Sequence, residues 1–249
     1  MPDELSGRGS GASGGRYAVY WAPQAESNLA RLGETWLGLG EGSEAAVQPP
    51  TIPGFDGPRI HALTAEPRRY GLHATLKPPF ALANGTDVAS LRQALNEFAA
   101  TQASVTLAAL RITLLDCFIA LTPSAASPAL DALAAGCVTH FDRFRAPAVP
   151  AELARRRAAG LSPVEDAYLL RWGYPYVLDR FRFHVTLTGP LDPAEAQRLM
   201  PPLIRLFAPV TRAPVTLGNI ALFHEPVPGE PFRLVERFPL RPPPRQASL

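Results

Sequence analysis

The sequence contains very little cysteine. Only Cys117 and Cys137 occur among 249 residues, and they do not form a Cys-x-x-Cys pair. This excludes a disulfide-rich scaffold and a zinc site built on cysteines. Two reduced thiols are typical of a cytoplasmic protein, so a cytoplasmic location is predicted.

Net charge and long hydrophobic runs are also lacking. The formal net charge is only +2, which is too small to attract long nucleic acid or an anionic membrane surface. No apolar run approaches the roughly 18 residues that span a bilayer. The first 15 residues are polar and rich in glycine and serine, unlike a secretory signal. We therefore expect no membrane segment and no long nucleic acid as partner, whereas the oligomeric state stays open.

Proline, in contrast, is abundant, with 28 residues, and this favours short elements and rigid loops. Residues 1–15 are predicted to form a disordered leader, and residues 241–249 a loose tail. Residues 16–240 are long enough for one domain with a sizeable core. A Pro- and Gly-rich loop is expected over residues 42–60, and its length would permit it to close over a cleft as a lid.

Hydrophobic periodicity and capping residues predict alternating strands and helices in the remaining chain. Strands are expected at 17–21, 72–76, 105–114, 117–121, 183–188, 215–223 and 232–238. Helices are expected at 27–39, 87–100, 128–144 and 193–207, with a helical hairpin over 151–172. This order amounts to strand–helix–strand–strand twice over. Since the strands suit antiparallel pairing, the predicted fold class is α+β.

The most specific signal is a repeat between residues 69–80 and 180–191. His73 aligns with His184, Thr75 with Thr186, and each motif continues as His-x-Thr-Leu with a proline shortly after. In both cases an amphipathic helix follows, and a pair of strands follows that helix. Agreement in local sequence and in element order indicates two related halves.

The spacing of the two motifs places their polar residues on one face. Side chains at positions i and i+2 of a strand point the same way. His73 and Thr75 therefore share a face, as do His184 and Thr186. Two such strands related by a pseudo-twofold axis would surround one cleft with two imidazoles and two hydroxyls.

That set of groups suits a phosphoryl substrate. An unperturbed imidazole has a pKa near ~6.5, so one histidine can accept a proton while the other donates one. Hydroxyl groups can donate hydrogen bonds to the non-bridging oxygens and hold the phosphorus in line. No metal is required if enough donors meet the developing charge.

The paired motifs resemble those of the two-histidine (2H, HxTx) phosphoesterase superfamily, which includes 2′,5′-RNA ligase-like proteins and cyclic nucleotide phosphodiesterases. Residues 70–80 (YGLHATLKPPF) and 181–191 (FRFHVTLTGPL) are most similar to a branch of uncharacterised proteins from bacterial phosphonate-utilisation operons. The resemblance implies two pseudo-symmetric α+β lobes, each an antiparallel sheet with flanking helices, facing a central cleft. The lobes would correspond roughly to residues 16–125 and 126–240.

The resemblance also implies roles for the motif residues. His73 and His184 correspond to the acid/base pair, and Thr75 and Thr186 to the phosphate-binding hydroxyls. Lys77 lies two residues further along the predicted strand face, as a phosphate ligand or as a solvated lysine at the strand end.

Further residues are candidates for lining the cleft. Arg182 would share the face of His184 and bind a second anionic group, and Tyr17 and Tyr70 would either line the cleft or pack as ordinary aromatics. The arginine run 155–157 is expected on a solvated helix face, with binding of an extended polyanion as the alternative that the low net charge disfavours, and Trp36 is expected in the core.

The remaining histidines carry no motif. His61, His140 and His224 form no His-x-His or His-x-x-x-His pair, so neither a metal site nor a cofactor is predicted.

The predicted function is therefore a metal-independent phosphoesterase. It would be a cyclic phosphodiesterase that acts on a small phosphorylated sugar or nucleotide and belongs to phosphonate metabolism. One alternative is a phosphodiesterase or ligase-like enzyme acting on 2′,5′ or 2′,3′-cyclic RNA ends, which would need a basic, aromatic-lined groove leading out of the cleft. Another is a non-catalytic protein that binds a phosphorylated metabolite, and a third is a cleft with an unrelated role.

Overall fold

A computed structural model describes residues 15–39, 49–158 and 160–242. Most of the predicted leader and tail, and residues 42–48 of the predicted loop, lie outside these described residues. The predicted loop is wrong at its C-terminal end, because residues 57–60 belong to a short helix, α2 (Gly57–Leu63). A second short helix, α3 (Ala65–Arg68), follows, and the sequence predicted neither. Asp56 caps α2, because its side chain accepts a hydrogen bond from the backbone N–H of Arg59.

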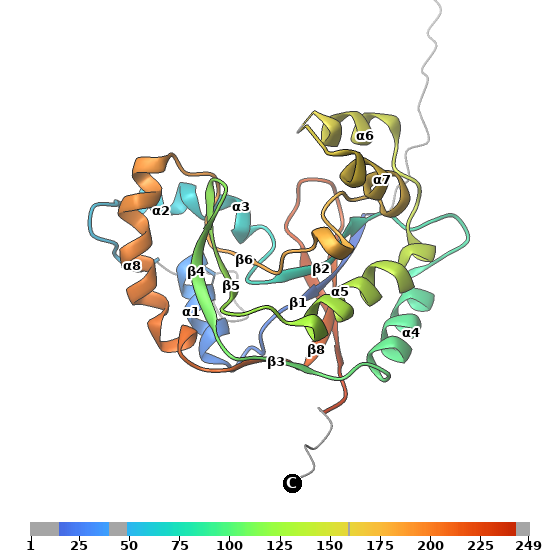
Figure 1. The fold of residues 1–249 in the computed structure, drawn as a ribbon, viewed down its shortest axis with the longest axis horizontal. Coiled ribbons are helices and arrows are strands. Elements are labelled where there is room, and N and C mark those ends of the chain that lie inside the picture. The colour runs from blue at the N-terminus through green and yellow to red at the C-terminus, as the bar shows by residue number, and fades with distance from the viewer. Residues whose placement is uncertain (1–14, 40–48, 159, 243–249) are drawn as a thin grey trace, which may run out of the picture.

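The described chain alternates strands and helices in the predicted order (Figure 1). The predicted single strands 105–114 and 215–223 are each two strands that lie in different sheets, and the predicted strand 183–188 has only two residues in strand conformation. The strands are β1 (Arg16–Trp21), β2 (Ala74–Phe80), β3 (Val105–Leu107), β4 (Leu110–Leu115), β5 (Phe118–Pro123), β6 (Val185–Thr186), β7 (Val215–Leu217), β8 (Asn219–Glu225) and β9 (Arg233–Pro239). The α-helices are α1 (Asn28–Leu37), α2 (Gly57–Leu63), α3 (Ala65–Arg68), α4 (Val88–Ala99), α5 (Pro128–His140), α6 (Pro150–Arg157), α7 (Pro163–Trp172) and α8 (Pro193–Thr211).

Seven of these strands form one antiparallel sheet in the order β4-β5-β6-β2-β1-β8-β9, and β3 pairs with β7 in a separate two-stranded sheet. The α+β class is thus confirmed. The two predicted half-sheets are joined edge to edge, because β2 and β6 pair at Ala74 and Val185.

A pseudo-twofold axis relates the two halves of the molecule. It passes between β2 and β6, and again between β3 and β7, where Thr106 lies opposite Thr216 and their hydroxyls are 3.0 Å apart. The order β1-α1-β2-α4-β3-β4 in the first half corresponds to β5-α5-β6-α8-β7-β8 in the second, and β9 is an addition.

The two halves exchange strands. The β4 strand of the first half pairs with β5 and packs on α8 of the second, and β8 of the second half pairs with β1 of the first. Figure 1 shows the result: α1 and α8 lie on one side of the molecule, and α4 and α5 on the other. Each side of the molecule is therefore built from both halves of the chain.

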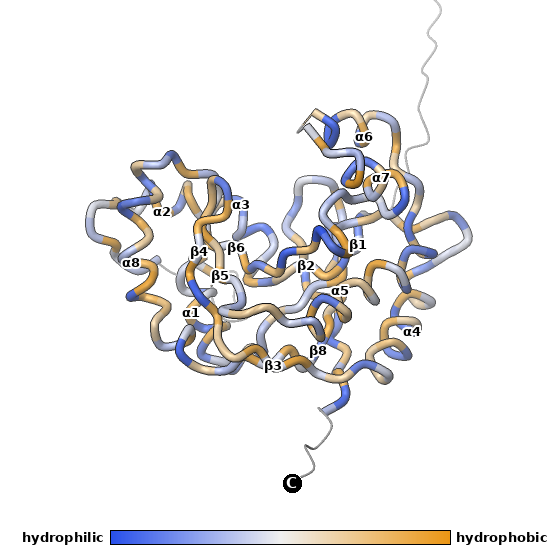
Figure 2. The backbone as a smooth tube through the Cα atoms, in the orientation of Figure 1, coloured by the Kyte–Doolittle hydropathy of each residue, from blue (hydrophilic) through white to orange (hydrophobic). Residues whose placement is uncertain are grey.

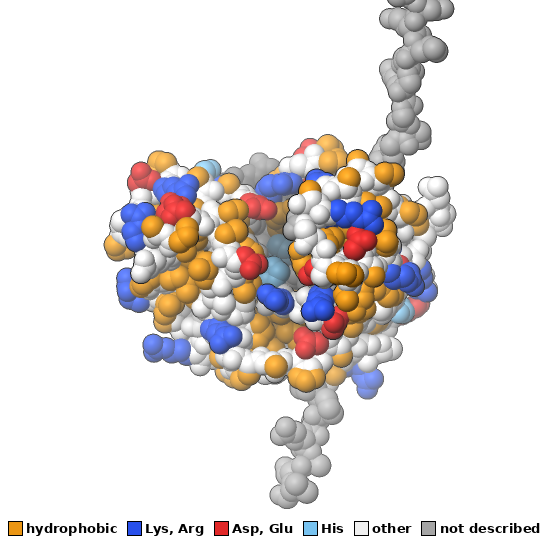
Figure 3. All heavy atoms as spheres, turned by 45° about the horizontal axis from the view of Figure 1, so that its top comes forward, with side chains coloured by type: hydrophobic (Ala, Val, Ile, Leu, Met, Phe, Trp, Pro, Cys, Tyr) orange, Lys and Arg blue, Asp and Glu red, His pale blue; other side chains and the backbone are white. Residues whose placement is uncertain are grey.

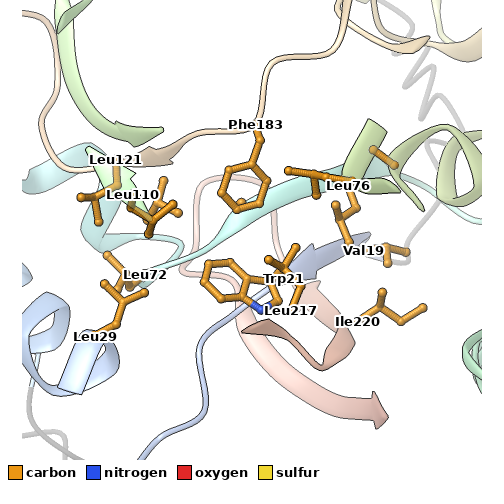
Figure 4. Close-up of a cluster of buried hydrophobic side chains, with 14 of the residues drawn as sticks. Val19, Trp21, Leu29, Leu72, Leu76, Leu110, Leu121, Phe183, Leu217 and Ile220 are labelled. Carbon is orange, nitrogen blue, oxygen red and sulfur yellow. The ribbon is translucent and has the colours of Figure 1, made fainter. Parts of the chain in front are cut away.

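Amphipathic helices cover the sheet and enclose its core. Hydrophobic and hydrophilic segments alternate along α4 and α8 (Figure 2), and the inward side chains, such as Leu95 and Leu199, are fully buried. The core around the paired strands includes Trp21, Leu76 and Phe183 (Figure 4). Trp36 is also buried, as predicted, and its Nε1 donates a hydrogen bond of 2.8 Å to the carbonyl of Leu187. This bond ties α1 to the end of the second motif.

Candidate active site

The two His-x-Thr motifs lie side by side at the centre of the sheet. Ala74 pairs with Val185, and His73 and Thr75 flank Ala74 as His184 and Thr186 flank Val185. His73, Thr75 and Thr186 line one cavity, and the ring of His184 packs against Phe118, which lines the same cavity, whereas Ala74 and Val185 are buried. The structure therefore brings together the two imidazoles and two hydroxyls that the spacing predicted on one face.

Both imidazoles are held by the same local contact. Nδ1 of His73 lies 2.9 Å from the carbonyl oxygen of Gly71, and Nδ1 of His184 lies 2.7 Å from that of Arg182. A carbonyl oxygen can only accept, so Nδ1 carries a proton in each ring. In the neutral form, Nε2 then keeps its lone pair and is free to act on a substrate.

Gly71 supplies the carbonyl of the first of these contacts. Its φ of +68° lies in the left-handed region, which residues other than glycine adopt at a cost. This conformation belongs to the turn between α3 and His73. The positive φ thus explains why the first motif has glycine at this position.

The surroundings of His73 keep its imidazole neutral. The ring of Tyr20 lies 4.1 Å from it and that of Tyr70 lies 5.5 Å from it, centroid to centroid. Burial lowers the pKa of His73 to about 4, the bond to Gly71 opposes this shift, and the positive charge that His184 can carry adds to it. The imidazole of His73 is therefore uncharged at neutral pH.

His184 has a more open environment. Its hydrogen bond to Arg182 lies at the surface, and its ring packs against Phe118 at a centroid distance of 5.7 Å. The two halves of the site are thus alike in backbone contacts and different in the side chains that cover the rings.

A cavity of about 670 Å³ lies over this face of the sheet. His73, Thr75 and Thr186 line it, whereas His184 lies beside it, next to the lining residue Phe118. Figure 3 shows histidine side chains at the bottom of a hollow, with Lys and Arg side chains around the opening. The size suits a small organic ligand.

Lys77 does not face this cavity, so its predicted role as a phosphate ligand is wrong. The register between β1 and β2 shifts by one residue: Tyr20 lies opposite Thr75, but Val19 lies opposite Lys77. Such a bulge turns the next side chain to the other face. Lys77 is consequently buried, and its Nζ donates to the carbonyl of Val138 at 3.1 Å and to Asp142 at 3.4 Å.

Arg182 and Tyr17 also lie outside the cavity. Residues 181–184 are not in a strand, so the alternation assumed for Arg182 does not hold, and its side chain lines a separate surface pocket. Tyr17 stacks on His224 at a centroid distance of 4.5 Å. Tyr70 lines the cavity, and so does Tyr20, which the sequence reasoning missed. Strand alternation from the buried pair Val19 and Trp21 could have identified Tyr20.

Four arginines line the cavity, and sequence reasoning did not assign any of them to the site: Arg16, Arg69, Arg155 and Arg156. Arg155 and Arg156 belong to α6, in the run expected to be merely solvated. Arg16 and Arg69 come from segments far apart in the chain and meet at the buried carboxylate of Glu225. Only the tertiary structure brings them together.

Within the described ranges, no group of three His, Cys, Asp or Glu side chains is arranged to hold a metal ion. Across the same ranges, no helix is both long and apolar enough to cross a membrane.

Comparison with known proteins places most of the chain in one family. Residues 75–233 match the model of a family described as "Protein of unknown function (DUF1045)", which is more than half of the 249 residues.

Two curated relatives share the name "Ribose 1,5-bisphosphate phosphokinase PhnN". The relative from Janthinobacterium sp. (strain Marseille) is 39% identical over 240 residues, which are 94% of this chain and 52% of the relative. The relative from Laribacter hongkongensis (strain HLHK9) is 36% identical over 220 residues, 88% of this chain and 50% of the relative. The chain thus spans about half the length of the curated relatives it matches.

Among solved structures, one described as "Crystal structure of phosphoesterase" aligns with a TM-score of 0.41 and 13% identity, over 92% of this chain and 99% of that chain. This similarity is too low to support a conclusion about function. The family match and the two curated relatives agree with the resemblance to a branch of uncharacterised bacterial proteins that the paired motifs indicated.

Proposed function

This chain belongs to the DUF1045 family, and from the geometry of its site we propose that it is a two-histidine phosphoesterase. The observation that best supports this proposal is the pair of His-x-Thr motifs on adjacent strands. In each imidazole, Nδ1 is bound to a backbone carbonyl, which leaves Nε2 for a substrate. This arrangement supports acid/base catalysis at a phosphorus atom.

The chemistry follows from the different surroundings of the two rings. Nε2 of the neutral His73 takes a proton from a water molecule, which attacks the phosphorus. One P–O ester bond breaks, and protonated His184 gives its proton to the leaving oxygen. The hydroxyls of Thr75 and Thr186 donate to the non-bridging oxygens during the displacement. A cyclic phosphodiester would thereby open to a phosphomonoester.

The substrate class in this proposal is a small phosphorylated sugar or nucleotide with a cyclic phosphate. The cavity volume of about 670 Å³ and the arginines in its wall support this size and charge. The relatives' names refer to a ribose phosphate, which agrees with a ribosyl substrate and with a place in phosphonate metabolism.

Cyclic RNA ends are a second candidate. Arg156 lies over the ring of Tyr174 at 4.9 Å, and both line the cavity, so a basic and aromatic wall leads from the histidines toward α6. Aromatic and arginine side chains of this kind can bind the base of a terminal nucleotide.

A hydrolysis screen with EDTA present tests the proposal. The panel contains 2′,3′-cyclic nucleotides, ribose 1,2-cyclic phosphate with and without a 5-phosphate, and short RNAs with cyclic ends. We expect turnover that survives the chelator and falls by about 10³-fold or more in His73→Ala and in His184→Ala. No turnover by folded wild-type protein on any member would refute the phosphoesterase and leave the binding-protein alternative.

A further inference from the structure

We propose that Arg16 and Arg69 form a second anion subsite, which binds another phosphoryl group of the same substrate whose ester is cleaved between His73 and His184. This inference rests on the proposed function and narrows its substrate class to compounds with a phosphate in addition to the cyclic phosphate. It is carried by an ion cluster around the buried Glu225, whose two arginines line the same cavity as His73.

The cluster is organised by one carboxylate. Glu225, in β8, has a fully buried side chain and accepts from Arg16 Nε at 2.5 Å, from Arg69 Nη2 at 3.3 Å and from the backbone N–H of Gly229 at 3.0 Å. Burial alone would raise the pKa of Glu225, but the hydrogen bonds from Arg16 and Gly229 outweigh it and lower the pKa. The carboxylate is therefore ionised and fixes both guanidinium groups.

The arginines keep positive charge and donors for a ligand. Two guanidinium groups share a single carboxylate, so one positive charge is not compensated within the cluster. Each guanidinium has five N–H donors. Within the described residues, one donor of each arginine reaches Glu225. The side chains of Arg16 and Arg69 are 33% and 37% exposed, and both line the cavity. A phosphoryl group there would receive forked, charge-assisted hydrogen bonds.

Aromatic rings set the position of this subsite relative to the histidines. The Arg69 guanidinium lies 5.5 Å from the ring of Tyr70, and that ring lies 5.5 Å from the ring of His73. Phe232 stacks on Tyr70 at 5.0 Å, and the Arg16 guanidinium lies 5.8 Å from Phe232. The ring of Tyr70 thus lies between the His73 ring and the Arg69 guanidinium. A single sugar unit can bridge this separation.

The second pair of cavity arginines is less suited to this role. Arg156 is already bound to Glu152 at 2.9 Å, and the Arg155 side chain is 71% exposed. Neither is held by a buried acceptor, so neither is preorganised as Arg16 and Arg69 are.

The test compares paired substrates on substituted full-length protein. Wild type, Arg16→Gln and Arg69→Gln are assayed on ribose 1,2-cyclic phosphate with and without a 5-phosphate, and on a 2′,3′-cyclic nucleotide with and without a 5′-phosphate. Arg92→Gln is the matched control, because Arg92 makes an exposed ion pair of 2.6 Å with Glu236 and does not line the cavity.

We expect wild type and the Arg92→Gln protein to prefer the substrate with the additional phosphate by about tenfold or more in kcat/KM. Arg16→Gln and Arg69→Gln should reduce this preference to within about threefold. Arg69→Lys should give an intermediate preference, since lysine keeps the charge and loses the fork. An unchanged preference in both glutamine variants overturns the subsite.

Two additional measurements keep the outcomes distinct. If a glutamine variant fails to fold because Glu225 is left without its partner, Arg16→Gln is combined with Glu225→Gln, which removes the buried charge. Calorimetric titration with ribose 5-phosphate, which has only the additional phosphate, should show binding that persists in His73→Ala and weakens in Arg16→Gln and Arg69→Gln. Such binding without turnover of any cyclic phosphate would refute the proposed chemistry and support the anion subsite. Binding that is equally strong in wild type and in both arginine variants would refute the subsite itself.

Discussion

At the scale of single residues, the site combines equal backbone contacts with unequal environments. His73 and His184 each donate from Nδ1 to the carbonyl two positions earlier, which fixes the same tautomer in both rings. Tyr20 and Tyr70 cover His73, whereas His184 contacts Phe118 near the surface. The pKa of His73 is therefore low, which agrees with the proposed role of His73 as the base.

The pH dependence of turnover should reflect this low pKa. A depressed pKa means that His73 stays deprotonated as the pH falls, until the pH approaches about 4. The acid limb of kcat/KM, which reports the free enzyme, should therefore lie well below the usual histidine value of ~6.5. A bound phosphate anion favours the imidazolium, so the acid limb of kcat should lie at higher pH than that of kcat/KM.

Both profiles can be measured between about pH 4 and 9 on the substrate that the hydrolysis screen identifies. Tyr70→Ala, which opens the ring to water, should move the kcat/KM limb toward ~6.5. Coincident limbs near ~6.5 in the wild type would contradict the assignment of His73 as the buried base.

At the scale of elements, short irregular segments determine which side chains reach the cavity. The turn at Gly71 supplies the carbonyl that contacts His73, and the bulge in β2 removes Lys77 from the face that His73 and Thr75 share. These features extend over one or two residues each, yet they set the composition of the site.

Gly71→Ala isolates the effect of the turn. A Cβ at this position would meet nothing within 4 Å, so the substitution adds backbone strain at a φ of +68° without a steric clash. We expect a loss of roughly 1–2 kcal/mol in unfolding free energy, together with a fall in kcat as the carbonyl leaves His73. Thermal unfolding and kinetics measure the two effects.

Gly85→Ala is the matched control for this turn. Gly85 has a φ of +81°, its Cβ would also meet open space, and it does not line the cavity. It should lose similar stability and keep its kcat. Equal activity in the two alanine variants would show that the Gly71 carbonyl does not position the imidazole.

The same irregular segments mark the limit of what the sequence could predict. Periodicity predicted most strands and helices, and the repeat predicted that His73 and His184 lie in one site, because both predictions depend on local spacing. Lys77 could not be placed, because strand alternation holds only while the register is unbroken. Arg16 and Arg69 could not be paired, because their common partner, Glu225, is distant in the chain and the contact exists only after folding.

At the scale of the whole molecule, the exchange of β4 and β8 makes the two sides interdependent. Each side contains strands and helices from both halves of the chain, and the pairs β2–β6 and β3–β7 connect the sides at the pseudo-twofold axis. Unfolding one side would remove strand partners from the other. The molecule should therefore unfold as one cooperative unit.

Matched leucine-to-alanine substitutions, one on each side of the molecule, test this cooperativity. Leu95 in α4 and Leu199 in α8 are both 0% exposed and occupy corresponding helices. We expect Leu95→Ala and Leu199→Ala each to cost about 2–5 kcal/mol and to shift a single calorimetric transition. A second transition in either variant, with the other side retaining its original midpoint, would show that the sides unfold independently.

The strand exchange also bears on how this architecture could have arisen. A polypeptide with one half alone would leave β4 without its neighbour, and two copies would restore the pairing by trading that strand across an axis at Thr106. Such an ancestral homodimer would have had two identical histidines in its shared site. Gene duplication and fusion would have released the two copies from that identity, so that one histidine could become enclosed by tyrosines while the other stayed near water.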